Sequence, residues 1–274
     1  MLIVVGVGLQ SHWNDVAYAV RRPDLLWRAF VAVNVIVPAT AVALCLVMPI
    51  AFYSAVGIVL MAVSPLAPFA PGKMLKAGAD TAFVDAVYVL LILASVVIIP
   101  ITLMLINLIA PKPLHIPERE LVLFVVKSVL VPLMLGLVIA SLWPRFAKRS
   151  APVARIVAFA IIIPLALLFL IKSFGAMAAL IGDGTIVTIV AVVVAGIIGG
   201  HWLGGHSLEH RAAMAQAAAT RHPGIAALLA RRNFDDQHVT LTIVLFVLTS
   251  VVVSIVYERW EDKAAARAKS ARTA

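Results

Sequence analysis

The sequence predicts an all-α membrane protein with about nine transmembrane helices. Hydrophobic residues make up 63% of the 274 residues and charged residues only 13%, a composition outside the range of soluble proteins. The apolar residues form long runs separated by short polar loops, and a run of about 20 can cross a bilayer as a helix. Proline interrupts two of these runs, which predicts two broken helices.

The chain begins with an apolar piece, Leu2 to Leu9, that is too short to cross a membrane. We expect either a half-helix or a start codon upstream of Met1 that would supply a missing first span. No basic lead and no cleavage site accompany the piece, so a cleavable signal peptide is not expected. A polar loop then leads to a span from about Leu25 to Val47, which contains Asn34 and Pro38.

The first predicted break follows the apolar piece from Ala51 to Val63. Three prolines lie within seven residues: Pro65, Pro68 and Pro71. Proline has no N–H and is not tolerated in a helix interior, so the helix must stop here. A short piece from Lys73 to Ala79 then precedes a long span, Asp80 to Ile109, that carries Asp85.

The loop from Pro111 to Pro117 divides the chain into halves. Spans are expected near residues 121–143, 154–171 and 185–203, and a basic loop at 144–149 joins the first two. The last of these spans holds glycines at four-residue spacing, a small face on which another helix can pack closely. These are Gly196, Gly200 and Gly204.

The second predicted break is the segment Thr220-Arg221-His222-Pro223-Gly224, which lies between two short apolar pieces. Pro223 disfavours helix at the residue before it, and Gly224 tolerates almost any backbone angle. Unwound backbone at membrane depth is tolerated only where protein buries it or where it lines a wet cavity. Since this break also carries an arginine and a histidine, we interpret it as part of a binding site. Ser207 is expected to cap the helix that leads to it.

The two halves share one order of elements: an apolar piece, a proline break, a short second piece, a charged patch and a long span. Such paired interrupted helices are typical of secondary transporters with an internal repeat. If the loops alternate sides, most of the 22 basic residues fall on one face. That bias predicts a multi-pass protein of the bacterial inner membrane with a cytoplasmic C-terminus.

Five short segments carry a resemblance to a known family. They are Gly6-Val-Gly8-Leu9, Pro38-Ala39-Thr40, Ser64-Pro65, Lys127-Ser-Val-Leu-Val-Pro132-Leu-Met-Leu-Gly136 and Arg221-His222-Pro223-Gly224. In this order and spacing the chain resembles the bile acid:sodium symporter family, in its bacterial branch of sodium-dependent organic-anion transporters. The likeness covers nearly the whole chain.

The resemblance implies ten helices in two inverted repeats, of which nine remain because the first helix is missing. It places the first repeat at 1–110, the linker at 111–117, the second repeat at 118–258 and a basic cytoplasmic tail at 259–274. A core domain with two crossing broken helices is expected at about 25–109 and 185–258. A panel domain that moves against it is expected at about 1–20 and 118–172.

The family's sodium ligands are not retained. The aligned positions hold Leu66, Ala67, Ala70 and Pro71 at the first break, Val84 and Tyr88 in the next span, and Ala217 and Arg221 at the second break. Sodium coupling at the usual sites is therefore not expected. Arg221 would instead place a permanent positive charge where the family holds its sodium ions, with Asp85 as the nearest counter-charge.

Taken together, these features predict a secondary transporter that moves a small or amphipathic organic anion by alternating access. The expected substrate-binding residues are Arg221, His222, Thr220, Asn34, Ser64, Pro65, Pro68 and Gly224. Asp85 or His222 is expected to carry a proton. Simpler interpretations stay open: Arg221 could extend to the membrane interface, Asp85 could favour a helix N-terminus, and His222 could cap a helix. Lys73 and Lys76 are expected to be topology signals, with Lys73 as a further candidate for the site.

Other functions are weaker alternatives. The chain could be a degenerate, non-transporting membrane sensor, or an intramembrane zinc protease that uses His206-Ser-Leu-Glu209-His210. No Walker A or dinucleotide motif appears in the sequence. We expect no cofactor, no metal and no nucleic-acid partner, since the basic residues are scattered over loops. The expected partners are the anion and the lipid bilayer, and the oligomeric state is left open.

Overall fold

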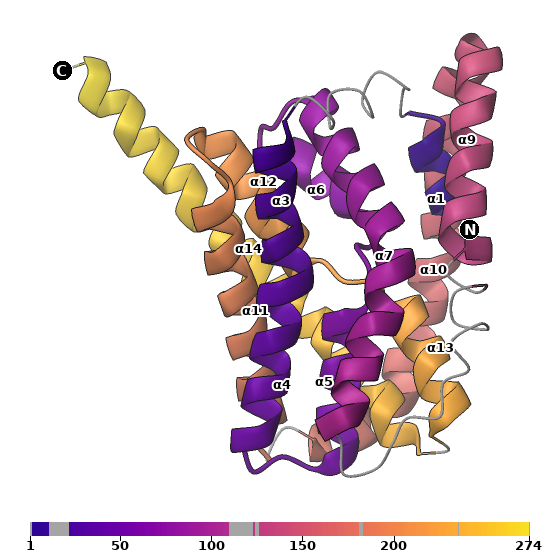
Figure 1. Ribbon diagram of the computed structural model, residues 1–274, viewed down its shortest axis with the longest axis vertical. Coiled ribbons are helices and arrows are strands. Elements are labelled where there is room, and N and C mark those ends of the chain that lie inside the picture. Colours follow the sequence, from indigo (N-terminus) through magenta and orange to yellow (C-terminus); the bar gives the residue numbers. More distant parts are fainter. Residues whose placement is uncertain are drawn as a thin grey trace.

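The computed structural model describes residues 2–10, 22–109, 123, 126–180, 183–234 and 236–273. Within these residues the elements are helices, joined by turns and loops, and none is a strand. The helices form an elongated bundle, from which the C-terminal part of the last helix projects (Figure 1). The prediction of an all-α fold is therefore confirmed.

Seven helical elements precede the predicted midpoint of the chain. They are α1 (Leu2–Gly8), α3 (Pro23–Phe30), the π-helix η1 (Val31–Ile36), α4 (Val37–Val47), α5 (Phe52–Val63), α6 (Ala70–Lys76) and α7 (Thr81–Ile109). Seven more follow it. They are the π-helix η2 (Val126–Leu130), α9 (Val131–Leu142), α10 (Pro144–Ala179), α11 (Thr185–Leu203), α12 (Leu208–Ala219), α13 (Pro223–Asn233) and α14 (Gln237–Thr273).

Three helical segments of the described chain are long and apolar enough to cross a membrane. They are Pro23–Val47, Thr185–Leu203 and Gln237–Ala264. Shorter apolar helices lie at Phe52–Val63, Thr81–Ser95 and Val126–Leu142. Large apolar side chains also lie on the outside of the bundle, for example Ile156, Leu167 and Phe174 of α10, where a bilayer would cover them. The membrane class is thus supported, while the count of nine spans and the two-repeat division stay predictions.

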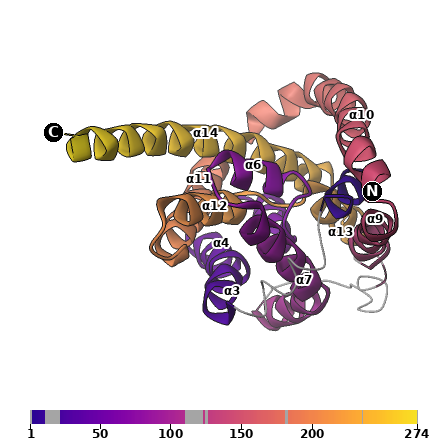
Figure 2. The same ribbon diagram turned by 90° about the horizontal axis from the view of Figure 1, so that it is seen from above.

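Helix α1 packs tightly against α9 through two glycines. A Cβ atom added at Gly8 would lie 2.3 Å from the carbonyl oxygen of Leu133, and one added at Gly136 would lie 2.5 Å from that of Val5. Only glycine allows two helices to approach this closely. Together α1, α9 and α10 form a group on one side of the bundle, as the view from above shows (Figure 2).

The glycine face predicted on α11 is confirmed. A Cβ atom at Gly200 would lie 2.5 Å from the carbonyl oxygen of Met214, and one at Gly204 would lie 2.4 Å from Cα of Arg211. Both neighbours belong to α12, so the glycines bring α11 and α12 into backbone contact. Ser207 caps α12 as predicted, since its Oγ accepts a hydrogen bond from the N–H of His210 at 3.1 Å.

Each π-helix lies just before a proline. Pro38 is the second residue of α4, after η1, and Pro132 is the second residue of α9, after η2. Proline has no N–H and its ring crowds the carbonyl of the preceding turn, so the helix widens there. One carbonyl of that turn consequently loses its helical donor.

Some sequence expectations were wrong in detail. Residues 144–149, predicted as a basic loop, are the first turns of α10, because Pro144 occupies the first helical position, where proline is favourable. The last helix does not end at residue 257 but continues to Thr273. The helical piece after the first break begins at Ala70, earlier than Lys73. The predicted loop at 111–117 lies outside the described residues.

Candidate functional site

The first break separates α5 from α6. Helix α5 ends at Val63, and Ser64 has an extended backbone (φ −63°, ψ 147°) because Pro65 follows it. The Ser64 hydroxyl donates to the carbonyl oxygen of Leu60 at 2.7 Å. Helix α6 begins at Ala70, with Pro71 in its first turn. The break predicted from the prolines is confirmed.

The second break separates α12 from α13. Thr220 (φ −107°, ψ 105°) and His222 (φ −87°, ψ 97°) are extended, and Pro223 begins α13. The N–H of Ile225 donates to Nδ1 of His222 at 3.3 Å, so the imidazole caps α13. This break too is confirmed, with the histidine in a capping role.

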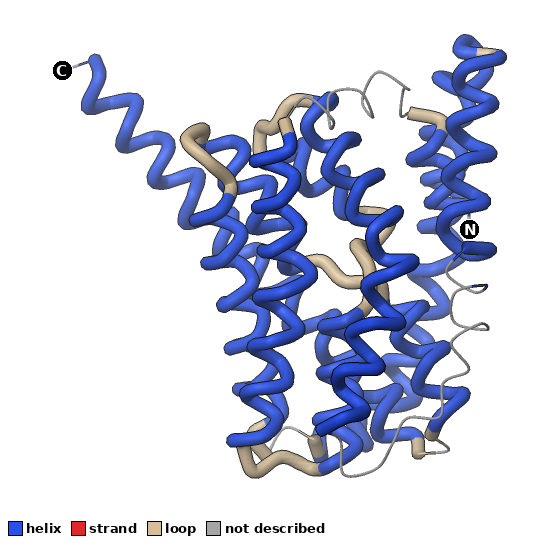
Figure 3. Tube along the Cα trace, viewed as in Figure 1, coloured by secondary structure: helices blue, strands red, loops and turns tan. Residues whose placement is uncertain are grey.

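The two breaks cross and pair. Leu66 and Arg221 form an isolated antiparallel bridge. The N–H of His222 donates to the carbonyl oxygen of Pro65 at 2.9 Å, and that of Ala67 donates to the carbonyl oxygen of Thr220 at 3.5 Å. Both loops meet near the middle of the bundle (Figure 3). The pairing satisfies backbone groups that have no water to bond inside a membrane.

The Arg221 side chain is 3% exposed and belongs to this crossing. Its Nη1 donates to the carbonyl oxygen of Ser64 at 3.3 Å, and its Nη2 donates to that of Val33 in η1. Nε has no partner. Arg221 therefore lies inside the bundle rather than extending to its surface, and its bonds are to neutral carbonyls.

The acceptor at Val33 follows from Pro38. In a π-helix a carbonyl accepts from the N–H five residues later, and residue 38 has no N–H. Nη2 of Arg221 supplies a hydrogen-bond donor to this turn from the other half of the chain. Sequence reasoning missed Val33, although the proline was the signal that could have found it.

Most of the predicted binding residues are engaged in building the crossing. The Thr220 hydroxyl donates to the carbonyl oxygen of Gln216 at 2.6 Å. The carbonyls of Ser64 and Pro65 accept from Arg221 and His222. Nδ2 of Asn34 is buried and has no hydrogen-bond partner in the part of the chain that the structure describes. Gly224 is exposed, and a Cβ there would lie 3.1 Å from the ring of His222.

The expected ion pair between Arg221 and Asp85 is not formed. Both hydrogen bonds of the guanidinium are made to carbonyl oxygens, and within the described part of the chain Arg221 belongs to no salt bridge. Asp85 instead lines a cavity to which Arg221 does not contribute. The pairing was wrong because α7 directs Asp85 into this cavity and not toward the crossing.

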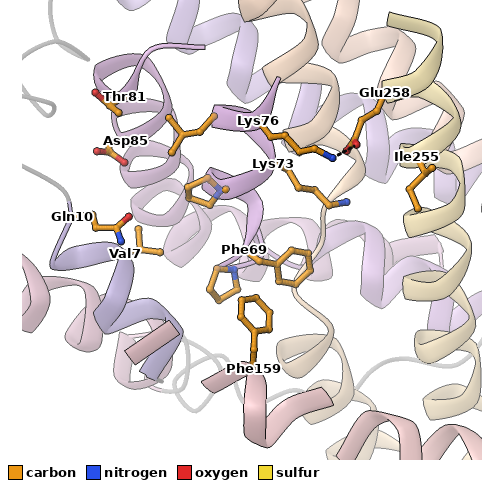
Figure 4. A pocket seen from close by; sticks show the side chains of 14 residues that line it. Val7, Gln10, Phe69, Lys73, Lys76, Thr81, Asp85, Phe159, Ile255 and Glu258 are labelled. Carbon is orange, nitrogen blue, oxygen red and sulfur yellow. Dashed lines mark hydrogen bonds and ion pairs between the residues drawn. The ribbon is translucent and has the colours of Figure 1, made fainter. Parts of the chain in front are cut away.

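The cavity has a volume of about 610 Å³ and lies between α1 and α10 on one side and α6, α7 and α14 on the other (Figure 4). Its polar lining residues are Gln10, Lys73, Lys76, Thr81, Asp85 and Glu258, and Pro68 is among its apolar ones. Nζ of Lys76 donates to Oε2 of Glu258 at 2.9 Å. The sequence could have indicated that Lys73 and Lys76 line one cavity, because residues three apart on a helix lie on the same face.

A second polar cluster joins α7 to α12. Nε2 of His210 lies 3.1 Å from Oδ2 of Asp80, and its ring stacks on Phe83. Partial burial raises the pKa of Asp80, but hydrogen bonds from the Phe83 N–H and from His210 outweigh it, so the pKa lies below its ordinary value. Among the described residues no three His, Cys, Asp or Glu side chains gather as a metal site. Glu209 of the suspected zinc motif accepts from the Ser207 hydroxyl.

Comparisons with known proteins identify the family of this fold. Residues 1–180 of the 274 match the model of the Sodium Bile acid symporter family. The match contains four of the five segments on which the sequence resemblance depended, and the fifth, Arg221-His222-Pro223-Gly224, lies beyond it. No curated protein matches the chain significantly.

Proposed function

This chain belongs to the Sodium Bile acid symporter family and is a membrane transporter of that type; on that basis we propose that it moves a small or amphipathic organic anion by alternating access, without sodium ions at the family's usual sites.

The observation that carries the proposal is the position of the Arg221 guanidinium. Unwound carbonyls at broken helices are the groups that coordinate sodium in transporters of this general kind. Here the carbonyls of Ser64 and Val33 accept hydrogen bonds from Arg221. The arginine is a cation that cannot leave and cannot be deprotonated at ordinary pH. It holds the two breaks together in place of a bound ion.

The residues at the family's other sodium positions do not fit the ion. Ala217 and Val84 have no side-chain oxygen, and a hard cation needs several oxygen ligands. Tyr88 has one buried side-chain oxygen, which is too few for the ion by itself. No step of the proposed cycle therefore depends on sodium.

The charge of Arg221 also supports an anionic substrate. A buried guanidinium with neutral partners leaves net positive charge inside the bundle, and in a medium of low dielectric constant this charge acts over several ångströms. An anion in the neighbouring cavity would be stabilised by it. The cavity has α1 and α10 on one side and α6, α7 and α14 on the other. Movement of the first group against the second changes which side of the membrane the cavity faces.

We assign any proton coupling to Asp85 rather than to His222. Asp85 lines the cavity, where a carboxylate can exchange protons with the substrate or with water. His222 uses Nδ1 to cap α13, a role that needs the lone pair on that nitrogen. The two candidates from the sequence therefore differ in their access to the cavity.

Uptake into proteoliposomes tests the proposal. The full chain would be reconstituted and the uptake of labelled taurocholate and of labelled benzoate measured, with sodium and pH gradients imposed separately. We expect uptake of at least one anion that is unchanged when choline replaces sodium. Uptake that strictly requires sodium would overturn the proposal. Binding without uptake of either anion would favour the non-transporting alternative.

A further inference from the structure

The cavity contains one lysine that stands apart from the ion pair beside it. Lys73 is the fourth residue of α6, is half-buried and lines the cavity wall (Figure 4). Within the described part of the chain its ammonium group has neither a hydrogen bond nor an ion pair. Three donors on a partly desolvated cation are therefore available to a ligand.

The neighbouring lysine shows which group such a ligand would carry. Lys76, one turn later on α6, binds the carboxylate of Glu258 at 2.9 Å. Glu258 also lies close enough to Lys73 to interact electrostatically with it. At this edge of the cavity Lys76 already binds a carboxylate, whereas Lys73 binds none among the described residues. An anionic group on a ligand is therefore the expected partner of Lys73.

Two aromatic rings provide an apolar surface in the cavity that Lys73 lines (Figure 4). Phe69 precedes α6 directly as its N-cap residue, and Phe159 comes from α10. Both are half-buried and line the cavity. A flat apolar group that lies along these rings would contact residues from both groups of helices. The volume of about 610 Å³ lies within the range of small-molecule sites.

We propose that Lys73 binds the anionic group of the transported ligand and that Phe69 and Phe159 hold a planar apolar body next to it. The ligand class is then an aromatic or otherwise flat carboxylate or sulfonate. This inference rests on the proposed transport function and deepens it, because it names the residues that select the ligand. Arg221 holds the two breaks together, and Lys73 contacts the anionic group of the ligand.

Direct binding of 2-naphthalenesulfonate to the full chain in lipid nanodiscs tests the charge contact. The affinity would be measured by isothermal titration calorimetry for the wild type, Lys73→Gln and Lys73→Arg. We expect Lys73→Gln to bind at least about tenfold more weakly, corresponding to about 1.4 kcal/mol, and Lys73→Arg to bind within a few-fold of the wild type. The cation 2-naphthylmethylammonium should not compete.

The Lys76–Glu258 pair supplies the matched control. Removal of both charges in Lys76→Gln/Glu258→Gln leaves Lys73 in place, so binding should be retained. Glu258→Gln alone should tighten binding, because a competing carboxylate is lost. Lys76→Gln alone should weaken it, since Glu258 can then turn to Lys73. Elution volume and thermal midpoint of each variant confirm folding.

The aromatic contact is tested with a second probe. Phe159→Ala should weaken binding of 2-naphthalenesulfonate several-fold and leave that of ethanesulfonate unchanged, because ethanesulfonate has no ring. The inference fails if Lys73→Gln, folded like the wild type, binds with unchanged affinity, or if the naphthyl cation binds as well as the anion. If the wild type transports anions but Lys73→Gln transports and binds equally well, the site fails and the transport function stands. If 2-naphthalenesulfonate binds through Lys73 but no anion is taken up, the transport function fails and the site stands.

Discussion

Nη1 of Arg221 donates a hydrogen bond to the carbonyl oxygen of Ser64 at 3.3 Å, across 157 residues of sequence. The bond links the second break to the end of the helix that leads into the first. Because Nη2 of the same side chain donates to Val33, one guanidinium joins η1 and both breaks. Substitution of Arg221 should therefore disturb the crossing of the two breaks, whereas substitution of an arginine on the surface should not.

Arg221→Ala should abolish anion uptake in proteoliposomes, and Arg221→Lys should lose most of it. Alanine leaves the carbonyls of Ser64 and Val33 without a donor, at about 1–3 kcal/mol for each buried group. Lysine keeps the charge but lacks the planar fork that reaches two acceptors in different directions. Arg231→Ala, at the exposed end of α13, is the control and should retain wild-type uptake. Full uptake by Arg221→Ala would show that the junction is dispensable.

Pro38→Ala should reduce uptake more than Pro132→Ala does. The two prolines follow equivalent π-helices, but only the turn before Pro38 supplies an acceptor to Arg221. Alanine at 38 restores an N–H that competes for that turn. Initial uptake rates, normalised to folded protein, measure the difference. Equal losses in both variants would contradict the role given to Val33.

Gly8→Ala should lower the stability of the protein by about 1–3 kcal/mol, the usual cost of added atoms in a tightly packed interior. The new methyl would lie 2.3 Å from the carbonyl oxygen of Leu133, so α1 and α9 must separate. Gly175→Ala in α10 is the control, because no described atom outside its own stretch of helix lies within 4 Å of its added Cβ. Thermal midpoints in detergent compare the two variants. A midpoint for Gly8→Ala as high as that of the control would mean that the two helices are not packed as described.

Asp85→Asn should remove any stimulation of uptake by an inward proton gradient, whereas His222→Asn should leave it intact. Asparagine cannot take up the proton that a carboxylate in the cavity would carry. At position 222, asparagine is a good N-cap and preserves the start of α13. Uptake at several outside pH values, with the inside pH fixed, separates the two residues. A loss of stimulation in His222→Asn alone would reverse the assignment.

The contact between Asp80 and His210 should stabilise the fold at pH values above the ordinary pKa of aspartate. This stabilisation should be lost at acidic pH. Hydrogen bonds lower the pKa of Asp80 in the folded protein, so its contribution is present above a pH of about 4 and is lost as the pH falls through the lowered pKa. Since its side chain is 54% exposed, the effect should not exceed about 1 kcal/mol. Asp80→Asn keeps an acceptor for the Phe83 N–H and removes the charge. The difference in thermal midpoint between the two proteins should shrink below pH 4, and a constant difference down to pH 3 would argue against the contact.

The places where the chain unwinds could be read directly from residue types. Pro65 and Pro223 each remove a donor and constrain the residue before them, so the ends of α5 and α12 follow from local chemistry. The close packing of another helix on the glycine face of α11 followed in the same way from glycine spacing, although the sequence did not indicate that this helix is α12. Helix boundaries were less certain, as α10 shows: Pro144 begins a helix where a loop was predicted.

The partners of individual side chains could not be read in this way. Asp85 was paired with Arg221 because both were charged and both lay near a break. In the folded protein the arginine bonds to backbone carbonyls, and the carboxylate lines a cavity with Lys73. A backbone carbonyl without a helical donor can belong to any type of residue, so the sequence gives little sign of it.

By itself, then, the sequence determined that this protein is helical, spans a membrane and has two breaks, because hydropathy and proline act locally on the chain that contains them. Its short motifs indicated the family by resemblance. Only the tertiary structure decided that Leu66 lies beside Arg221, that Val33 accepts from the same guanidinium, and that two lysines share a cavity with Asp85 and Glu258. Those relationships depend on how helices far apart in the chain cross, and the crossing is fixed by packing and backbone hydrogen bonding rather than by any one residue.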